Sequence, residues 1–178
     1  YELNYRDHLT LYNYCKKNKK KFVSSVFGYK SFNLYNKFKT DFIKIPSGEI
    51  NNIPCLNFLD NFNKNIILST GMATPKEINN AVNALKKTKN KRKLTLMHGV
   101  SSYPAKFDEM NLNSIKFLKK EYNLNVGLSD HTDSTIIPFM AHIIGANYIE
   151  KHFTLNKSLI GPDHKASIDE AQLKEIVY

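Results

Sequence analysis

Short apolar runs typical of strands alternate with segments of helical periodicity along the whole chain, and this alternation constrains the fold more than any other feature. The runs expected to be strands cover residues 22–27, 42–45, 66–68, 94–97, 126–128 and 148–150. Helices are expected over residues 5–20, 31–38, 53–62, 74–87, 112–122 and 134–147, and from residue 167 onward. Strands that alternate with helices form a parallel sheet covered by helices, so the sequence predicts an α/β fold.

Two kinds of parallel α/β fold fit this alternation. A doubly wound dinucleotide-binding sheet would carry a Gly-x-Gly-x-x-Gly turn after an early strand, and the sequence contains none. A (β/α)8 TIM barrel would carry polar residues at the end of nearly every strand. The predicted strands do end in such residues, from Ser24-Ser25 to Glu150-Lys151-His152. Because a full barrel needs eight strands and about 250 residues, we predict an incomplete barrel that forms a single domain over residues 1–178.

The charge and the cysteines limit the classes of partner and compartment. The chain of 178 residues has a net charge of +10, and lysines concentrate at residues 16–21 and 86–93. Such clusters are compatible with a nucleic-acid footprint. Each one ends a predicted helix, however, where lysine complements the helix dipole, so we expect no nucleic-acid partner. Cys15 and Cys55 lack CxxC spacing, and no apolar run is long enough for a membrane span. These features predict a cytoplasmic protein with no membrane partner.

Two histidines follow consecutive predicted strands. His131 lies in the segment 126–132 (VGLSDHT) and His152 in the segment 148–154 (YIEKHFT). A strand, a helix and a second strand of this length form one βαβ unit, so both imidazoles are expected at the carboxyl edge of the sheet, where α/β folds bind ligands and metals. Two imidazoles on neighbouring strands can share one divalent ion. Either histidine could instead be structural. A third histidine, His98, follows the predicted strand 94–97 and could be a further ligand, but we prefer the structural interpretation for it.

Two upstream strand ends carry residues suited to a phosphate. Residues 44–49 (KIPSGE) place an ammonium group, a hydroxyl and a carboxylate after one strand, and residues 69–74 (STGMAT) place hydroxyls before a helix. A lysine, hydroxyls and the free N–H groups of a helix N-terminus can all bind phosphate. The alternatives are an ordinary turn for the first segment and helix capping by Thr74 for the second.

Five motifs occur in order along nearly the whole chain and together resemble those of the sialic acid synthases, which include N-acetylneuraminate and legionaminate synthases. They are residues 44–49 (KIPSGE), 67–72 (ILSTGM), 129–132 (SDHT), 150–154 (EKHFT) and 161–167 (GPDHKAS). The resemblance implies a (β/α)8 barrel followed by an antifreeze-like C-terminal domain, and a homodimeric full-length protein. This chain would cover about strands 3–8 of the barrel. The first two βα units and the C-terminal domain would be absent, and the fragment alone would be inactive.

The resemblance also implies a transferase reaction of sialic acid biosynthesis, in which phosphoenolpyruvate condenses with N-acetylmannosamine or a related N-acetylated hexosamine and phosphate is released. A divalent metal, Mn²⁺ or Mg²⁺, would be bound by His131 and His152, with Glu49 and Glu150 as further catalytic residues. The implied substrate-binding residues are Ser25, Lys44, Ser47, Ser69, Ser101, Ser129 and Asp163. Ser25 and Ser101 stand where other members carry Thr and Asn, respectively, which leaves the contact of Ser101 open.

Two other functions are compatible with the residues alone. One is another phosphate-handling aldolase-type barrel, which would lack the paired metal-binding histidines or use a Schiff-base lysine. The other is a basic nucleic-acid-binding module that uses the two lysine clusters. Its binding would be sensitive to salt and independent of His131.

Overall fold

The structure is a computed structural model that describes residues 3–86 and 93–177, and it divides into two compact units. The first unit comprises residues 1–68 and 73–94, and the second comprises residues 69–72 and 95–178. Strand pairing is parallel in both units. No helix within the described ranges is both long and apolar enough to cross a membrane.

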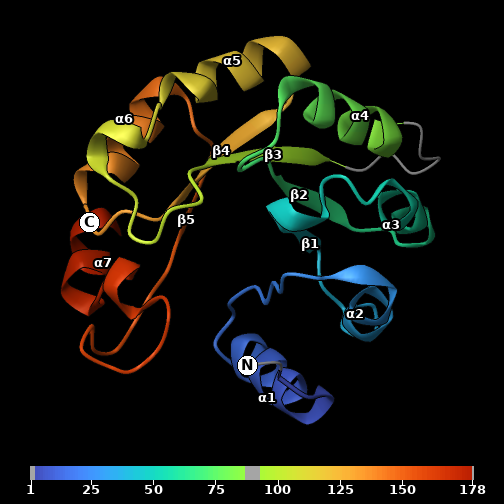
Figure 1. Cartoon of the computed structure of the whole chain (residues 1–178). Coiled ribbons are helices and arrows are strands. Elements are labelled where there is room, and N and C mark those ends of the chain that lie inside the picture. Colours follow the sequence, from blue (N-terminus) through green and yellow to red (C-terminus); the bar gives the residue numbers. More distant parts are fainter. Residues whose placement is uncertain (1–2, 87–92, 178) are drawn as a thin grey trace. The chain divides into compact units, whose positions relative to one another are not determined.

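The first unit contains a parallel pair of strands with helices around it (Figure 1). β1 (Phe42–Ile45) pairs with β2 (Asn65–Ser69), with Phe42 opposite Asn65 and Ile45 opposite Leu68. The helices are α1 (Tyr5–Lys17), α2 (Gly28–Tyr35), α3 (Ile53–Phe58) and α4 (Pro75–Lys86), and short 3-10 segments cover Ser47–Glu49 and Leu59–Asn61. Each of these helices overlaps a stretch where the sequence predicts one.

The predicted start of α4 is confirmed by its hydrogen bonds. The Thr74 N–H donates to Glu77 Oε2 at 2.7 Å, and the Glu77 N–H donates to Thr74 Oγ1 at 3.3 Å. These reciprocal bonds form a capping box, which satisfies N–H groups that the first helical turn leaves without a partner. The segment 69–74 therefore ends in an ordinary helix cap, as the alternative interpretation of Thr74 predicted.

The second unit contains three strands in parallel register. β3 (Leu94–Gly99) pairs with β4 (Asn125–Asp130), which pairs with β5 (Tyr148–Lys151). The helices are α5 (Asn113–Tyr122), α6 (Ile136–Ile144) and α7 (Glu170–Val177), with 3-10 segments at Phe107–Glu109 and His164–Ala166. α5 and α6 both contact β4. The order strand, helix, strand between β4 and β5 is the βαβ unit that the sequence predicts.

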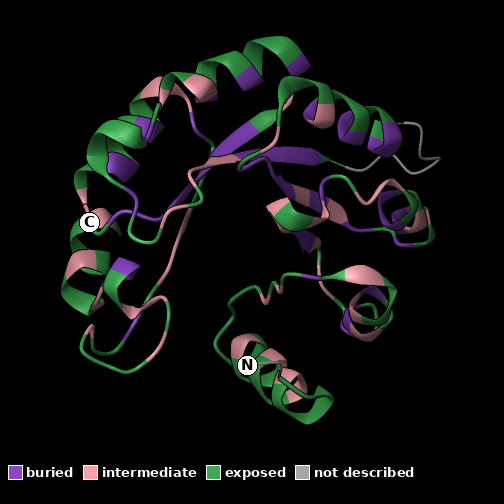
Figure 2. Cartoon of the chain, in the orientation of Figure 1, coloured by how far each residue is buried: buried purple, intermediate pink, exposed green. Residues whose placement is uncertain are grey.

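Buried side chains follow one another without alternation along β1, β3 and β4 (Figure 2). In the first unit, Ile43 and Ile45 of β1 are no more than 1% exposed, and in the second unit Val126 and Leu128 of β4 are fully buried. Continuous burial of this kind is typical of parallel strands that are covered on both faces. β1, β3 and β4 are therefore interior along most of their length, whereas the residues of β5 are exposed or half-buried.

One predicted strand is wrong. Residues 22–27 do not form a strand, and only Ser25 makes an isolated parallel bridge, with Lys44. The reason is that the apolar side chain of Phe22 packs against Tyr12 and Phe38, and the Phe22 carbonyl accepts a hydrogen bond from the Tyr35 hydroxyl at 3.3 Å. The apolar run thus serves an aromatic cluster next to α1 and α2 instead of a strand ladder.

Candidate active site

The carboxyl ends of β4 and β5 bring together side chains that lie far apart in the sequence. Ser129 of β4 is the register partner of Glu150 of β5, and the Ser129 hydroxyl donates to Glu150 Oε1 at 2.6 Å. The same hydroxyl lies 3.3 Å from His131 Nε2. A serine, a carboxylate and an imidazole are therefore in direct contact at this edge of the second unit.

His131 is held as a neutral imidazole of defined orientation. Its side chain is nearly buried, with 8% exposure, and Nδ1 lies 2.5 Å from the Val100 carbonyl oxygen. Burial is the main cause that lowers the pKa of His131, and the nearby His152 lowers it further, against the raising effect of the Val100 bond. Because a carbonyl only accepts, Nδ1 carries the proton and Nε2 keeps its lone pair. Nε2 is the atom that could ligate a metal.

His152 and Tyr103 complete the group around His131. The ring centroids of His131 and His152 are 5.4 Å apart, and the two rings meet at 66°. The Tyr103 ring stacks on His131 at 4.2 Å and meets the edge of His152 at 5.6 Å. His152 Nδ1 lies 3.8 Å from Asp163 Oδ2. The predicted residues Ser129, His131, Glu150, His152 and Asp163 thus form one connected cluster.

Tyr103 was not singled out from the sequence. It lies on the segment that follows β3, in Ser101-Ser102-Tyr103-Pro104. Burial raises the pKa of the Tyr103 hydroxyl, and the charges of Asp163 and Glu150 raise it further. The hydroxyl is therefore protonated near neutral pH and could donate a hydrogen bond. An aromatic residue among polar ones directly after a buried strand was the available signal.

The two histidines fit part of a metal site. In the described part of the chain, no three His, Cys, Asp or Glu side chains form a group that could hold a metal ion. A neutral imidazole with a free Nε2 lone pair is nevertheless a proper nitrogen donor, and the bond from Nδ1 to a carbonyl is the usual support for a metal-binding histidine. The donor set is thus two imidazoles, with other ligands still required.

For Ser69 and Ser101, the described contacts show no direct bond to the histidine cluster. Ser69 is the last residue of β2 and is 8% exposed, and the next residue, Thr70, bonds the Met97 carbonyl through its N–H at 2.9 Å and its hydroxyl at 3.1 Å. Ser101 is exposed after β3. Among the described contacts, none joins either serine side chain to His131 or His152. Proximity to a phosphate ligand therefore stays a prediction for both serines.

In the first unit, the predicted binding residues gather at the carboxyl end of β1. Lys44 is 6% exposed within β1 and makes the parallel bridge with Ser25, which is itself exposed. Ser47 to Glu49 form the 3-10 turn that follows, and Glu49 Oε2 accepts from Asn52 Nδ2 at 2.9 Å. The residues that carry the ammonium, hydroxyl and carboxylate groups thus follow one another at the end of β1, and their joint contact with a ligand stays a prediction.

His98 behaves as the structural interpretation predicts. Its Nε2 lies 2.7 Å from the Met110 carbonyl oxygen, and burial lowers the pKa of the ring. A half-buried histidine bonded to a backbone carbonyl is a satisfied interior group.

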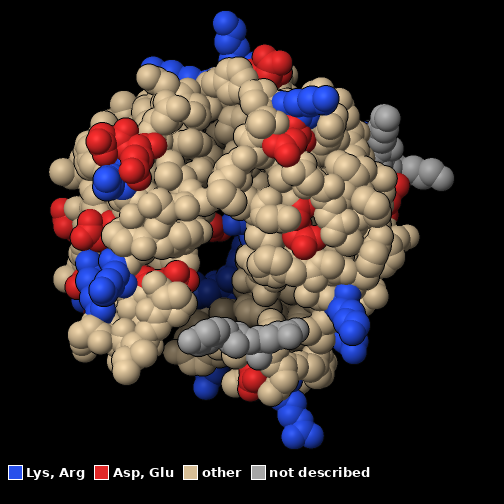
Figure 3. Space-filling model, viewed as in Figure 1, with Lys and Arg blue, Asp and Glu red and all other residues tan. Residues whose placement is uncertain are grey.

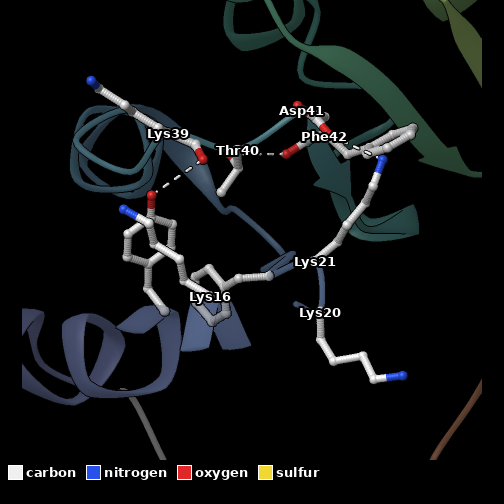
Figure 4. Close-up of a pocket in the computed structure, with 9 residues that line it drawn as sticks. Lys16, Lys20, Lys21, Lys39, Thr40, Asp41 and Phe42 are labelled. Carbon is white, nitrogen blue, oxygen red and sulfur yellow. Dashed lines mark hydrogen bonds and ion pairs between the residues drawn. The ribbon is translucent and has the colours of Figure 1, made fainter. Parts of the chain in front are cut away.

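A lysine-rich cavity of about 330 Å³ lies at the other end of β1 and does not resemble a phosphate site. Lys16, Lys20, Lys21 and Lys39 line it, but their ammonium groups point away from one another (Figure 4). Lys21 pairs with Asp41 at 3.0 Å and lies over the Phe42 ring at 5.0 Å. Because Phe42 begins β1, this cavity is separate from the Ser47–Glu49 turn.

On the face shown in Figure 3, the basic side chains of the described residues lie in separate groups, with acidic side chains near several of them. The first lysine cluster includes Lys16 and Lys17, which occupy the last turn of α1, where lysine complements the helix dipole. Residues 87–92 of the second cluster lie outside the described residues.

The profile of the NeuB family matches residues 1–178. An N,N'-diacetyllegionaminic acid synthase from Campylobacter jejuni is 46% identical over 174 residues, which are 97% of this chain and 52% of that protein. A pseudaminic acid synthase from Helicobacter pylori is 35% identical over 96% of this chain and 50% of its own length. The chain therefore spans about half the length of the curated relatives that it matches.

A solved structure supports the same assignment. The N-acetylneuraminic acid (sialic acid) synthetase from Leptospira borgpetersenii, crystallised with citrate, matches 98% of this chain and 61% of its own chain, with a TM-score of 0.92 and 34% sequence identity. The predicted fold class, part of a (β/α)8 barrel, is thereby confirmed.

Proposed function

Because the chain belongs to the NeuB family, we propose that the intact protein is a sialic acid synthase-type transferase that condenses phosphoenolpyruvate with an N-acetylated hexosamine and releases phosphate. The observation that carries this proposal is the neutral, nearly buried imidazole of His131 in contact with His152 and with the Ser129–Glu150 pair. Such a group can bind a cation beside an acceptor for substrate protons. A strand end with only a structural role does not require such a group.

The proposed reaction forms a C–C bond and breaks a C–O bond. C3 of the enol phosphate attacks the aldehyde carbon of the open-chain sugar, water adds to C2, and phosphate leaves with its bridging oxygen. A divalent metal, Mn²⁺ or Mg²⁺, supplies Lewis-acid polarisation of the aldehyde oxygen when bound. His131, through Nε2, and His152 are the residues that would hold it. Glu150 accepts the hydrogen bond of the Ser129 hydroxyl, and its carboxylate could accept a proton from water.

The remaining predicted residues are assigned to substrate binding. Hydroxyls and an ammonium group recognise the phosphate and carboxylate of phosphoenolpyruvate; these are Ser25, Lys44, Ser47, Ser69 and Ser129, with Ser101 as a further candidate. Glu49 and Asp163 are the carboxylates proposed to accept hydrogen bonds from the sugar hydroxyls. The position of Asp163 next to His152 supports this role, because it places a carboxylate beside a residue that would hold the metal ion at the sugar aldehyde.

For the sugar, we propose a precursor of neuraminic or legionaminic acid over one of pseudaminic acid. The identity to the legionaminic acid synthase is 46%, against 35% to the pseudaminic acid synthase. The segment 163–167 (DHKAS) also resembles neuraminate and legionaminate synthases more than pseudaminate synthases. The intact protein is further proposed to be a cytoplasmic homodimer.

The test uses the intact protein and measures phosphate release from phosphoenolpyruvate in the presence of N-acetylmannosamine or the legionaminic acid precursor. His131→Ala and His152→Ala are expected to abolish turnover, and EDTA is expected to abolish it in the wild type. His142→Ala is the matched control, because His142 is exposed on α6 and lies outside the cluster. Full turnover by His131→Ala in EDTA would overturn the proposal, as would inactivation by borohydride trapping of a lysine with substrate.

A further inference from the structure

We propose that the buried ion pair between Asp130 and Lys151 positions His131 and His152 for metal binding, so that Asp130 and Lys151 are positioning residues of the site. This inference rests on the proposed function. Asp130 and Lys151 are register partners at the ends of β4 and β5, and each immediately precedes one of the two histidines. A link between them therefore joins the two chain segments that carry the imidazoles.

The pair is buried and its geometry is defined by further hydrogen bonds. Lys151 Nζ lies 2.8 Å from Asp130 Oδ2, and the side chains are 7% and 0% exposed, respectively. Lys151 Nζ also donates to the Thr132 carbonyl at 2.6 Å and to the Ser134 carbonyl at 3.3 Å. The ammonium group therefore has as many acceptors as it has N–H donors.

Asp130 fixes the chain on the far side of His131. Its Oδ1 accepts a hydrogen bond from the Thr132 N–H at 2.9 Å. His131 thus lies between Asp130, which is a member of the ion pair, and Thr132. The Thr132 N–H donates to Asp130, and the Thr132 carbonyl accepts from Lys151. Any shift of the pair would move the backbone on both sides of the imidazole.

Apart from the Tyr103 ring, which contacts both imidazoles, the other anchors of the two histidines are separate. His131 is held by Val100 through Nδ1 and by Ala105, whose N–H donates to the His131 carbonyl at 3.0 Å. His152 accepts at its carbonyl from the Ile168 N–H at 2.9 Å. Two side-chain links join the ends of β4 and β5, the Ser129–Glu150 hydrogen bond and the Asp130–Lys151 pair, and the second joins the residues that immediately precede the two rings, which lie 5.4 Å apart.

A role in positioning explains a feature that stability does not. Replacing a buried ion pair by well-packed apolar residues is often neutral or stabilising, so a buried pair is weak evidence for a stabilising role. Apolar side chains would, however, not fix the direction of the segment from residue 131 to residue 134. Removing a residue that orients metal ligands typically costs about 10- to 100-fold in metal affinity.

The experiment compares Asp130→Asn, Lys151→Met and the double variant in the intact protein. Titration with Mn²⁺, followed by the electron paramagnetic resonance signal of the free ion, reports metal affinity without turnover. Each single variant should raise the Kd for Mn²⁺ about tenfold or more and lower kcat about 100-fold, while KM for phosphoenolpyruvate changes less than about threefold. The double variant should be no worse than the worse single variant, because the two residues act as one unit.

Lys174→Met is the matched control in the same unit. It breaks a Lys–Glu pair of similar length, 2.7 Å, whose side chains are 65% and 75% exposed, and it should change none of the three quantities. Asp130→Glu and Lys151→Arg keep both charges in case the neutral variants do not fold. They should melt near the wild-type temperature and still bind Mn²⁺ more weakly.

Wild-type Mn²⁺ affinity and kcat in the folded Asp130 and Lys151 variants would overturn the inference. Loss of folding in all of these variants would also overturn it, because the pair would then be needed for the fold alone. If His131→Ala is inactive while these variants match the wild type, only the positioning role fails. If His131→Ala keeps full turnover, the proposed function itself fails.

Discussion

The strand ends of the two units contain similar kinds of side chain, but these side chains differ in burial and in their bonding partners. At the ends of β4 and β5, Asp130 pairs with Lys151, Ser129 lies 3.3 Å from His131 Nε2, and all four side chains are nearly buried. At the end of β1, Lys44 is also nearly buried, but the residues of the Ser47–Glu49 turn that follows are half-buried or exposed, and Glu49 bonds the nearby Asn52. Burying charge is costly unless each group finds a partner. The second unit meets that cost at the position where a precise geometry would serve catalysis.

The largest contrast that we predict concerns one glycine in each unit. A Cβ on Gly127 of β4 would lie 2.5 Å from Met97 Sδ and 2.6 Å from the Tyr148 carbonyl oxygen. Because β3 and β5 pair with β4 on both sides, β4 cannot shift to relieve these close contacts. Gly127→Ala should therefore lower the free energy of unfolding by about 3 kcal/mol or more, measured by urea denaturation.

Gly48→Ala is the control in the first unit. No atom lies within 4 Å of the added Cβ, and the Gly48 φ lies outside the left-handed region. The substitution should be neutral or stabilise by up to about 1 kcal/mol, since alanine restricts the unfolded chain. Equal effects of the two substitutions would contradict the contrast between the two strand ends.

The histidine cluster was predictable because its signal is local, whereas its supports were not. His131, His152, Ser129 and Glu150 stand directly after apolar runs, so their position at one sheet edge follows from the order of the elements. Tyr103 carries a local signal, an aromatic residue among polar ones after β3, but its contact with His131 depends on the path of the chain after that strand.

The error at residues 22–27 has a related cause. An apolar run fits a strand as well as it fits an aromatic cluster, and the partners of Phe22 on α1 and beyond α2 decide between the two. The sequence gives the residue types of such a run, but long-range packing selects the structure.

The second contrast compares serines. Ser129→Ala removes a buried hydroxyl that donates to Glu150 and contacts His131. We expect a loss of about 1–3 kcal/mol in the free energy of unfolding, because the half-buried Glu150 carboxylate loses a hydrogen bond from a buried donor and hydrogen bonds to charged groups are the stronger ones. Ser47→Ala, on the half-buried turn after β1, should cost no more than about 0.5 kcal/mol. Urea denaturation of both variants checks this, and an equal loss would show that burial does not set the difference.

The third prediction concerns pH and uses His98 of β3. Burial lowers the pKa of His98 from its ordinary value of 6.5. Between the lowered value and 6.5 the unfolded state binds more protons than the folded state, so stability rises with pH there and is lost as the pH falls below 6.5.

The slope contributed by one such group is at most about 1.4 kcal/mol per pH unit. His98→Gln should therefore show a smaller loss of unfolding free energy than the wild type between pH 7.5 and pH 5.5, measured by urea denaturation at both pH values. An unchanged slope would mean that His98 titrates alike in the folded and unfolded states.

The smallest effect is expected for the ion pair between Lys21 and Asp41 of the first unit. Its length, 3.0 Å, is close to the 2.8 Å of the Asp130–Lys151 pair, but its side chains are 68% and 64% exposed. Exposed pairs gain little because water screens the attraction and two flexible side chains must be ordered. Asp41→Asn should change the free energy of unfolding by less than about 1 kcal/mol, and added salt should shrink the difference further. A loss as large as that of Asp130→Asn would mean that distance, and not burial, sets the strength of the two pairs, and the contrast between the two units would then lose its physical basis.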